Sequence, residues 1–415
     1  MKSIRPSTIS GAVDAPPSKS AMLRSLAAAL LAEGTSEIFY PTFCGDALAG
    51  LRIIEALGAK IERQNDHLII HGGFDPQSET LDCGESGLCL RMFAPIAALS
   101  GRSITLTGAG SLQRRPLDFL GEPLRRLGVA ISGNAVRLPL TVHGPLHGGE
   151  VEVDGSISSQ LLSGLLFALP RCAHPSKLTV RELKSAPYIR MTLQTLAQAG
   201  VHIEAEDDLS AFAIPCGQNY QAQKFIIEGD WSAAAFWLVA GAIGGAVAIG
   251  RLDLKSWQAD REILTALREA GAQVSVESDF IEVRQSLLRA FSFDATDCPD
   301  LVPPLAVLAA HCRGESVLYG VKRLRYKESD RAAALSESFS RQGIECRVDN
   351  DRMIIKGGRM VGGAWPTFHD HRLAMAGAVA SLTAEAPIII DDENCVAKSY
   401  PDFFRDLNQL TGGEQ

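Results

Sequence analysis

The sequence lacks the features that mark metal-binding, secreted and nucleic-acid-binding proteins. Its nine cysteines are scattered, with no Cys-x-x-Cys pair, which argues against a zinc site or a disulfide framework and favours a reduced, cytoplasmic protein. The first residues have no apolar segment typical of a secretory signal. Acidic residues outnumber basic ones by 48 to 40, so we expect no general nucleic-acid binding, although a local basic site fits that balance.

One uncharged run is long enough to be tested as a membrane span. It covers residues 233–249 and reads AAAFWLVAGAIGGAVAI, which is marginal for the roughly 30 Å of a bilayer core. Gly244 and Gly245 interrupt the run, and the part that follows them is short and β-branched. A buried helix, a glycine turn and a buried strand therefore fit it better than a membrane span.

The chain contains an internal repeat. Five segments share the order helix end, glycine, strand, polar turn, strand. Their glycines stand 70, 72, 71 and 72 residues apart, at Gly58, Gly128, Gly200, Gly271 and Gly343. Glycine suits the left-handed position that closes a helix, and the alternating apolar residues that follow predict a β-hairpin in each segment.

The repeat predicts the domain organisation. Dividing 415 residues by the period gives about six α/β modules, but only five hairpins are visible. We expect the sixth module to be assembled from both ends of the chain, with the N-terminal strand completing it. The predicted domains are 16–227 and a discontinuous domain of 1–15 plus 228–415, each of three modules, with ligands bound in the cleft between them.

Six junctions between a loop and a predicted helix carry polar side chains, and five of them carry cations in this acidic chain. The first, PPSKSAMLR, places Lys19 and Arg24 at the start of a helix that Ser18 or Ser20 can cap. Cations there oppose the helix dipole, so a bound anion that also meets the free amide groups would explain them. The simpler alternative is an incidental basic helix start. The motif is not a P-loop, because the required glycines are absent.

The other five junctions have a similar character. In DCGESGLCLR an arginine follows glycines and a serine, and Ser158 and Ser159 are natural caps for the helix that begins QLLSG. Lys327, Asp330 and Arg331 share one face if LRYKESDR is helical, because they stand at i, i+3 and i+4. DHRLAMA and CVAKSYPDF complete the set. Each alone is compatible with a capped helix or a solvated charged face, but together they indicate a substrate with several phosphates or carboxylates.

These motifs, in this order and spacing, closely resemble those of the 5-enolpyruvylshikimate-3-phosphate synthases, in the enolpyruvyl transferase family. The resemblance runs from Pro17 to Phe404 and rests on PPSKSAMLR, LRYKESDR, DHRLAMA and AKSYPDFF in combination. It implies an α/β fold of two domains, each of three βαβαββ units with pseudo-threefold symmetry, like an inside-out barrel, with the active site in the interdomain cleft. It also implies a cytoplasmic enzyme of the shikimate pathway of aromatic amino-acid biosynthesis, and a target of glyphosate.

The implied activity transfers the enolpyruvyl (carboxyvinyl) group of phosphoenolpyruvate to the 5-hydroxyl of shikimate 3-phosphate and releases phosphate. These substrates are the expected partners of a monomer that needs no metal, organic cofactor, nucleic acid or membrane. Two alternatives are a UDP-amino-sugar enolpyruvyl transferase and a non-catalytic phosphosugar-binding protein on the same fold. The first typically has asparagine where Ser20 follows Lys19, and a loop cysteine that residues 113–116 lack; intact Asp300 and Glu328 argue against the second.

The resemblance implies a role for each residue that matches a family motif. The expected acid–base residues are Asp300, Glu328 and Lys19. The expected contacts of shikimate 3-phosphate are Lys19, Ser20, Arg24, Ser158, Ser159, Gln160, Ser185, Tyr188, Asp300 and Lys327. The expected contacts of phosphoenolpyruvate are Lys19, Gly87, Arg91, Arg115, Gln160, Arg331, Arg372 and Lys398, with His371 on the same side.

Five positions depart from the family pattern. The family often has asparagine-alanine-glycine-threonine where this chain has ESGL, from Glu85 to Leu88, so Leu88 lacks a hydroxyl beside the phosphoenolpyruvate site. Arg323 replaces a frequent asparagine, and Ala186 replaces a frequent lysine. We expect these differences to alter inhibitor sensitivity and substrate affinity more than the type of reaction.

Overall fold

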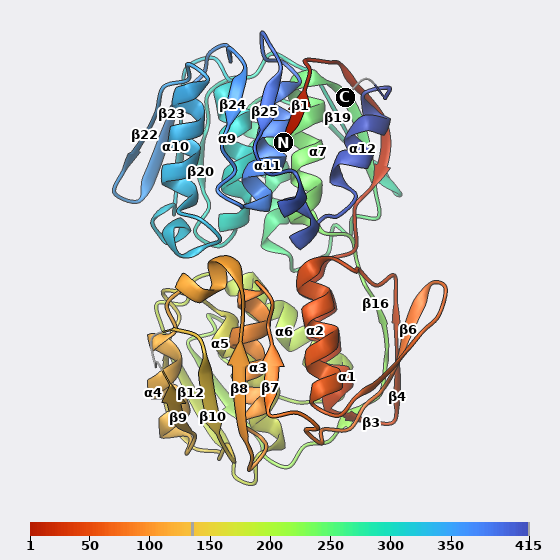
Figure 1. Cartoon of the computed structure of the whole chain (residues 1–415), viewed down its shortest axis with the longest axis vertical. Helices are drawn as coiled ribbons and strands as arrows, with labels where there is room; N and C mark the ends of the chain where they lie inside the picture. The colour runs from red at the N-terminus through yellow and green to blue at the C-terminus, as the bar shows by residue number, and fades with distance from the viewer. Residues whose placement is uncertain (134–136, 414–415) are drawn as a thin grey trace. The chain divides into compact units, whose positions relative to one another are not determined.

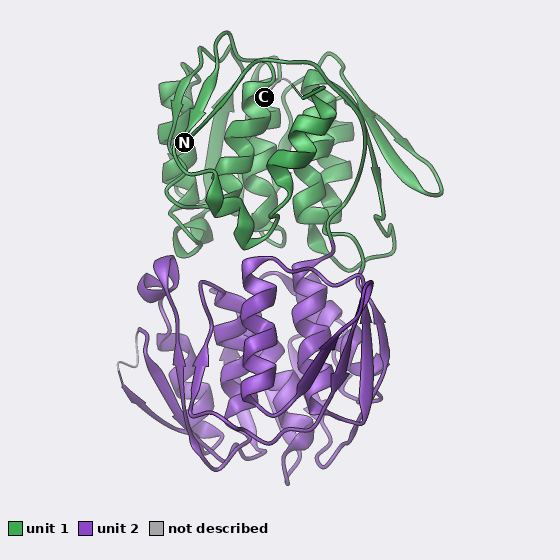
Figure 2. Ribbon diagram, turned by 45° about the vertical axis from the view of Figure 1, so that its right-hand side comes forward, with its two compact units in different colours: residues 1–16, 228–415 green, residues 17–227 purple. Residues whose placement is uncertain are grey.

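The computed structural model of the chain describes residues 1–133 and 137–413. The chain divides into two compact units, shown in different colours in Figure 2: unit 1 is Met1–Pro16 with Glu228–Gln415, and unit 2 is Pro17–Ile227. The chain therefore leaves unit 1 after its first strands and returns to it after residue 227. Across the described residues, no helix combines the length and the apolar composition needed to cross a bilayer.

Unit 2 contains three four-stranded sheets built on one plan. Across each sheet, the first two strands are parallel, and the last two form an antiparallel hairpin. In hydrogen-bonded order the sheets are β16 (Lys224–Ile226), β4 (Thr35–Phe39), β6 (His67–His71) and β5 (Lys60–Arg63); β7 (Thr80–Asp82), β8 (Ser103–Thr107), β10 (Leu140–His143) and β9 (Ala130–Gly133); and β11 (Glu150–Asp154), β12 (Ser176–Arg181), β14 (Ala211–Ile214) and β13 (Glu204–Ala205). A short parallel pair joins β3 (Ala32–Glu33) to β15 (Tyr220–Gln221).

Helices fill the centre of unit 2, and the sheets lie outside them (Figure 1). Every residue of α3 (Gly87–Ala97) is buried, as are most residues of α1 (Lys19–Leu31) and α5 (Gln160–Ala168). A helix that is apolar on all sides is stable only inside a core, which gives the inside-out arrangement. The other helices are α2 (Gly45–Ala56), α4 (Asp118–Arg126) and α6 (Ala186–Gln198), with 3₁₀ helices η1 (Gly110–Arg114) and η2 (Leu169–Arg171).

Unit 1 repeats this plan in two of its sheets, while its third sheet has three strands. Its centre holds three fully buried helices, α7 (Trp231–Gly244), α9 (Val302–Ala310) and α11 (His371–Ser381). Its sheets are β2 (Ile9–Asp14), β17 (Gly245–Gly250), β19 (Phe280–Arg284) and β18 (Gln273–Val276); β20 (Ser292–Asp294), β21 (Glu315–Tyr319), β23 (Arg352–Lys356) and β22 (Cys346–Asp349); and β1 (Lys2–Ile4), β25 (Ile388–Ile390) and β24 (Gly363–Trp365). The remaining helices are α8 (Ile263–Glu269), α10 (Arg331–Arg341), α12 (Phe403–Leu410), η3 (Ala259–Glu262), η4 (Pro299–Leu301), η5 (Lys322–Tyr326) and η6 (Asn394–Lys398).

The structure confirms the repeat. The five predicted hairpins form, and the glycine before each has a φ between 75° and 115°. Antiparallel pairing of β1 with β25 confirms the sixth module made from both ends of the chain. The uncharged run forms α7 followed directly by β17, as expected of a buried helix and strand. The predicted turn of the second hairpin includes 134–136, which lie outside the described residues.

Candidate active site

At the start of α3, three of the predicted phosphoenolpyruvate ligands converge on Gly87. A Cβ atom at residue 87 would lie 2.7 Å from Nη1 of Arg115 and 3.5 Å from Nη1 of Arg91. The Oε1 atom of Gln160 would be 3.7 Å away, and it accepts a hydrogen bond of 3.1 Å from Arg91. Both arginines are buried. Two buried guanidinium groups over the open first turn of a helix form a place that suits a compact anion.

The local sequence explains this arrangement. Ser86 caps α3, since its hydroxyl accepts a hydrogen bond of 3.3 Å from a backbone N–H one turn later. Arg115 donates to the hydroxyl of Ser111 at 3.3 Å. The carboxylate of Glu85 accepts from the amide and the hydroxyl of Ser111 at 3.4 and 3.5 Å. Glu85, where the family often has asparagine, therefore supports the loop that carries Arg115.

Lys19 is the first residue of α1, and its ammonium group lies 3.0 Å from Oδ2 of Asp46. From the sequence alone, either Ser18 or Ser20 could cap this helix. The structure selects Ser18, whose hydroxyl accepts from the amide of Ala21 at 3.3 Å. Asp46 lies in the first turn of α2, with only 5% of its side chain exposed. The ion pair therefore fixes the Lys19 cation at the start of α1.

Arg24 is buried, and its guanidinium group is held by other parts of unit 2. It donates to the hydroxyl of Thr192 at 2.9 Å, to the carbonyl of Tyr188 at 3.0 Å and to the carbonyl of Ser20 at 2.9 Å. Burial lowers the pKa of Arg24 from its ordinary value to about 10, so it stays a cation at neutral pH. These bonds tie α1 to α6 beside Tyr188, while direct contact of Arg24 with shikimate 3-phosphate stays a prediction.

The other predicted contacts of shikimate 3-phosphate stand at the starts of α5 and α6. The hydroxyl of Ser158 accepts from the amide of Gln160 at 3.2 Å, and the N-cap residue itself is Ser159. Ser185 precedes α6 with φ 60° and ψ 40°. This left-handed conformation strains a residue that has a side chain, and such strain is concentrated at functional sites. Tyr188 follows in the first turn of α6, where its amide donates to the carbonyl of Ser185 at 3.1 Å.

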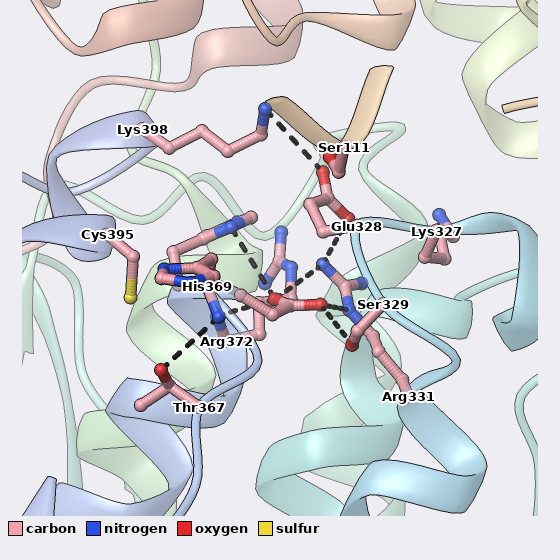
Figure 3. A network of polar contacts seen from close by, with 12 residues as sticks. Ser111, Lys327, Glu328, Ser329, Arg331, Thr367, His369, Arg372, Cys395 and Lys398 are labelled. Carbon is pink, nitrogen blue, oxygen red and sulfur yellow. Dashed lines mark hydrogen bonds and ion pairs between the residues drawn. The ribbon is translucent and has the colours of Figure 1, made fainter. Parts of the chain in front are cut away.

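In unit 1, the predicted acid–base residues and cations form one ion cluster, part of which Figure 3 shows. Its members are Asp300, Lys327, Glu328, Arg331, Asp370, Arg372 and Lys398. They come from η4, the loop between η5 and α10, the first turns of α10 and α11, and the end of η6. Four cations and three carboxylates leave a formal charge of +1, which favours binding of a further anion.

The two predicted carboxylates share one guanidinium group in this cluster. Asp300 Oδ1 lies 2.7 Å from Nη1 of Arg331, and Glu328 Oε2 lies 2.6 Å from its Nη2. The remaining cations lie around them: Lys327 is 3.2 Å and Arg372 3.4 Å from Asp300. Burial would raise the pKa of Asp300, but Arg372, Lys327 and Arg331 hold it well below 3.8. Asp300 is therefore ionised at neutral pH and has no proton to give.

LRYKESDR does not form one helix. The 3₁₀ helix η5 ends before Lys327, which has an extended backbone (φ −83°, ψ −156°), and α10 begins at Arg331. The interpretation that Lys327, Asp330 and Arg331 share a helix face was therefore wrong. The reason is that Asp330 caps α10, its side chain accepting an amide N–H three residues later at 3.3 Å. This cap starts the helix late and leaves Lys327 in a loop.

Comparisons with known proteins agree with these residues. The family model described as EPSP synthase (3-phosphoshikimate 1-carboxyvinyltransferase) matches residues 4–407. The chain belongs to the EPSP synthase family. A 3-phosphoshikimate 1-carboxyvinyltransferase of Thermococcus kodakarensis is 39% identical over 408 residues, covering 98% of this chain and 99% of the relative. One of Clostridium novyi is 37% identical over 422 residues, covering 99% and 97%. An EPSP synthase structure from Acinetobacter baumannii matches with a TM-score of 0.84 at 28% identity, covering 99% and 98% of the chains.

Membership of the EPSP synthase family confirms the resemblance and the fold class, and it makes the chain a transferase of aromatic amino-acid biosynthesis. The relatives named above do not favour the UDP-amino-sugar transferase or the phosphosugar-binding protein. The structure brings the predicted residues of unit 1 together in the ion cluster, with His371 beside it, its Nδ1 atom 3.6 Å from Oδ1 of Asp370. Those of unit 2 lie at or near the starts of α1, α3, α5 and α6, except Arg115, which follows η1. Their individual roles stay predictions.

Two buried carboxylates of this chain were missed by reasoning from the sequence. Asp46 pairs with Lys19, and Asp370 pairs with Arg331 at 2.7 Å. Each stands at the start of a helix, where aspartate ordinarily indicates a cap or a dipole partner. Asp370 lies inside DHRLAMA, so the motif itself was a signal; Asp46 lies in no motif. What distinguishes both from ordinary caps is burial beside a cation that is distant in sequence.

Proposed function

We propose that this protein transfers the enolpyruvyl group of phosphoenolpyruvate to the 5-hydroxyl of shikimate 3-phosphate and releases inorganic phosphate. Membership of the EPSP synthase family supports this reaction. The observation that carries it is the ion cluster, which holds an ionised Asp300 beside a second carboxylate, Glu328, and four cations. Addition followed by elimination needs groups that take up and give up protons and also fixed positive charge, and this proposal draws them from the two carboxylates and the four cations.

The proposed reaction has two steps. In the addition, C3 of phosphoenolpyruvate gains a proton, while the 5-hydroxyl oxygen bonds to C2 and loses its proton. In the elimination, C3 loses a proton, the bond from C2 to the phosphate oxygen breaks, and the double bond returns. We assign the proton of the 5-hydroxyl to Asp300, because an ionised carboxylate is a base. We assign proton transfer at C3 to Glu328, with Lys19 assisting.

The remaining side chains bind the substrates in this proposal. Buried arginines suit the phosphate and carboxylate groups of phosphoenolpyruvate because they offer charged, bidentate hydrogen bonds. The proposed ligands of phosphoenolpyruvate are Gly87, Arg91, Arg115, Gln160, Arg331, His371, Arg372, Lys398 and Lys19. The proposed ligands of shikimate 3-phosphate are Lys19, Ser20, Arg24, Ser158, Ser159, Gln160, Ser185, Tyr188, Asp300 and Lys327. A single site in an interdomain cleft remains a prediction from the family resemblance.

We further propose that the protein acts as a cytoplasmic monomer. All nine cysteines lie within the described residues and are free, and six of them are buried, which supports a reducing compartment. Size-exclusion chromatography with light scattering measures the oligomeric state. A mass equal to one chain is expected, and a mass of two chains would contradict the monomer.

Release of inorganic phosphate tests the reaction. The purified protein is mixed with shikimate 3-phosphate and phosphoenolpyruvate, and in parallel with each compound alone. We expect phosphate to appear only with both, together with the enolpyruvyl ether detected by NMR. Exchange of shikimate 3-phosphate for UDP-N-acetylglucosamine is the matched control and should give no phosphate. Turnover with the UDP sugar, or no turnover with either acceptor, would contradict the proposal.

A further inference from the structure

We infer that Asp370 is a positioning residue that fixes the guanidinium group of Arg331 in the ion cluster; this inference rests on the function proposed above. Asp370 is the N-cap residue of α11 and is fully buried. An N-cap needs only one acceptor oxygen facing one amide. Both oxygens of Asp370 have charged or polar donors besides that amide, so the carboxylate has a second task.

The contacts of Asp370 define that task. Its Oδ2 atom accepts from Nε of Arg331 at 2.7 Å, and its Oδ1 atom accepts from Nη2 of the same side chain at 3.1 Å. The hydroxyl of Ser329 donates to Oδ2 at 3.0 Å, and the amide of Arg372 donates to Oδ1 at 3.0 Å. A two-point contact between a carboxylate and a guanidinium group fixes the orientation of the plane as well as its distance.

The three carboxylates around Arg331 are not equivalent. Asp300 has 23% of its side chain exposed and Glu328 10%, whereas Asp370 has none. Each of the two partly exposed carboxylates meets Arg331 through one nitrogen, at Nη1 and Nη2. Only Asp370 takes the edge that includes Nε. An arriving anion therefore competes with Asp300 and Glu328 for Arg331, while Asp370 keeps the guanidinium plane in place.

Asp370 also sets the position of its neighbours. Asp370 accepts a hydrogen bond from the amide of Arg372 in the first turn of α11 and from the side chain of Arg331 in the first turn of α10. It therefore connects the starts of these two helices. Through Ser329 it holds the loop that carries Glu328. One buried carboxylate thus orients cations from two helices and the loop that carries Glu328. This role explains why an acidic residue stands in a cluster that must bind anions.

Replacement by asparagine separates positioning from capping. Asparagine is as good an N-cap as aspartate, but it removes the charge and one acceptor facing Arg331. We expect Asp370→Asn to lower kcat/KM for phosphoenolpyruvate at least tenfold, with a much smaller change in KM for shikimate 3-phosphate. The matched control is Asp330→Asn, the same substitution at the N-cap of α10, where the aspartate is exposed and caps its helix at 3.3 Å; it should stay within twofold of wild type.

A double-mutant cycle shows whether Asp370 acts through Arg331. In an Arg331→Lys background, which lacks the Nε–H and the planar fork, the further loss from Asp370→Asn should fall below threefold. Equal losses in both backgrounds, or equal losses from Asp370→Asn and Asp330→Asn, would overturn the inference. If Asp370→Asn does not fold, Ser329→Ala tests the inference instead, because it removes one hydrogen-bond donor to Asp370. It should lower kcat/KM for phosphoenolpyruvate two- to fivefold. An unchanged value would overturn the inference. A wild-type protein without turnover would overturn the proposed function and this inference together, whereas an active wild type with an unaffected Asp370→Asn variant would overturn only the inference.

Discussion

Arg115 occupies the space that a side chain at residue 87 would need, since its Nη1 atom lies 2.7 Å from the position of a Cβ on Gly87. Gly87→Ala should therefore displace the Arg115 guanidinium group while α3 itself survives, because the close atom is the far end of a flexible side chain. Loss of one charged hydrogen bond costs about 1.5–3 kcal/mol. We expect KM for phosphoenolpyruvate to rise by roughly tenfold or more, with little change for shikimate 3-phosphate.

Steady-state kinetics with each substrate varied in turn measure this effect. Gly101→Ala is the control, because a Cβ at residue 101 would meet only open space. Equal KM values for phosphoenolpyruvate in wild type and Gly87→Ala would mean that Arg115 does not bind this substrate.

The two carboxylates that share Arg331 carry the second prediction. Asp300→Asn and Glu328→Gln should each lower kcat by about 10²–10⁴, the range of general acid–base catalysis. Isothermal titration with shikimate 3-phosphate should show that binding survives in both variants. Glu337→Gln, on the exposed side of the same helix as Arg331, removes a 2.8 Å ion pair with Arg341 and should leave kcat unchanged. Near-normal turnover in both Asp300→Asn and Glu328→Gln would contradict the acid–base assignment.

The third prediction concerns acid stability. The folded protein holds the pKa of Asp300 well below 3.8, whereas an unfolded chain restores a value of about 3.9. A carboxylate with a lowered pKa stabilises the fold above its unfolded pKa, and this contribution is lost as the pH falls toward the lowered value. The difference in melting temperature between wild type and Asp300→Asn should therefore be largest near neutral pH and shrink below about pH 4. A difference that stays constant from pH 7 to pH 3 would contradict the ion-pair account.

The fourth prediction concerns Leu88, which is buried in the first turn of α3 beside Gly87. Threonine is common here in the family, and its hydroxyl can help to fix the helix that carries Arg91. Glyphosate is longer than phosphoenolpyruvate, so we expect it to crowd Gly87 more closely and a small displacement to penalise the inhibitor more than the substrate. We expect wild type to be active and weakly inhibited, and Leu88→Thr to bind glyphosate more tightly by roughly one to two decades, since one hydrogen bond to a charged neighbourhood is worth about 1.5–3 kcal/mol.

Inhibition constants for glyphosate, measured at matched saturation with phosphoenolpyruvate, decide this point. The control is Ser111→Thr, which keeps the hydroxyl and tests the adjacent loop. Leu90→Thr would not serve, because the Leu90 side chain is fully buried. Equal constants for wild type and Leu88→Thr, or weaker inhibition of the variant, would refute the role given to Leu88.

The modules were predictable from the sequence because their signals are local. A glycine with positive φ ends each helix, and strand alternation with a polar turn follows within a few residues. The pairing of β1 with β25 was predictable only by counting modules, because no local pattern connects Lys2 with Ile390. The start of α10 was not predicted correctly. Asp330 caps the helix, which therefore begins at Arg331, so the charged run that fits a helix face is a loop followed by a helix.

The site was predictable where a motif holds the residue and not where burial alone gives it a role. Arg331 and Glu328 stand in a motif, and the structure brings both to Asp300. The carboxylates that pair with Lys19 and Arg331 cannot be recognised from the sequence, because an aspartate at a helix start, such as Asp46 or Asp370, resembles an ordinary cap. Their roles depend on a cation 27 residues away for Asp46, and 39 for Asp370, and on the exclusion of water around the pair.

The pairing of β1 with β25 has a consequence for synthesis on the ribosome. Unit 2 is one continuous segment, Pro17–Ile227, whose strands pair with one another, so it can fold as soon as it has left the exit tunnel. The strands that precede it must wait: β2 for β17, and β1 for a partner that begins only at Ile388. At about 5–20 residues per second, this delay lasts on the order of ten seconds or more. Strands β1 and β2 are thus translated before unit 2, but they reach their native pairing only after unit 2 can have folded.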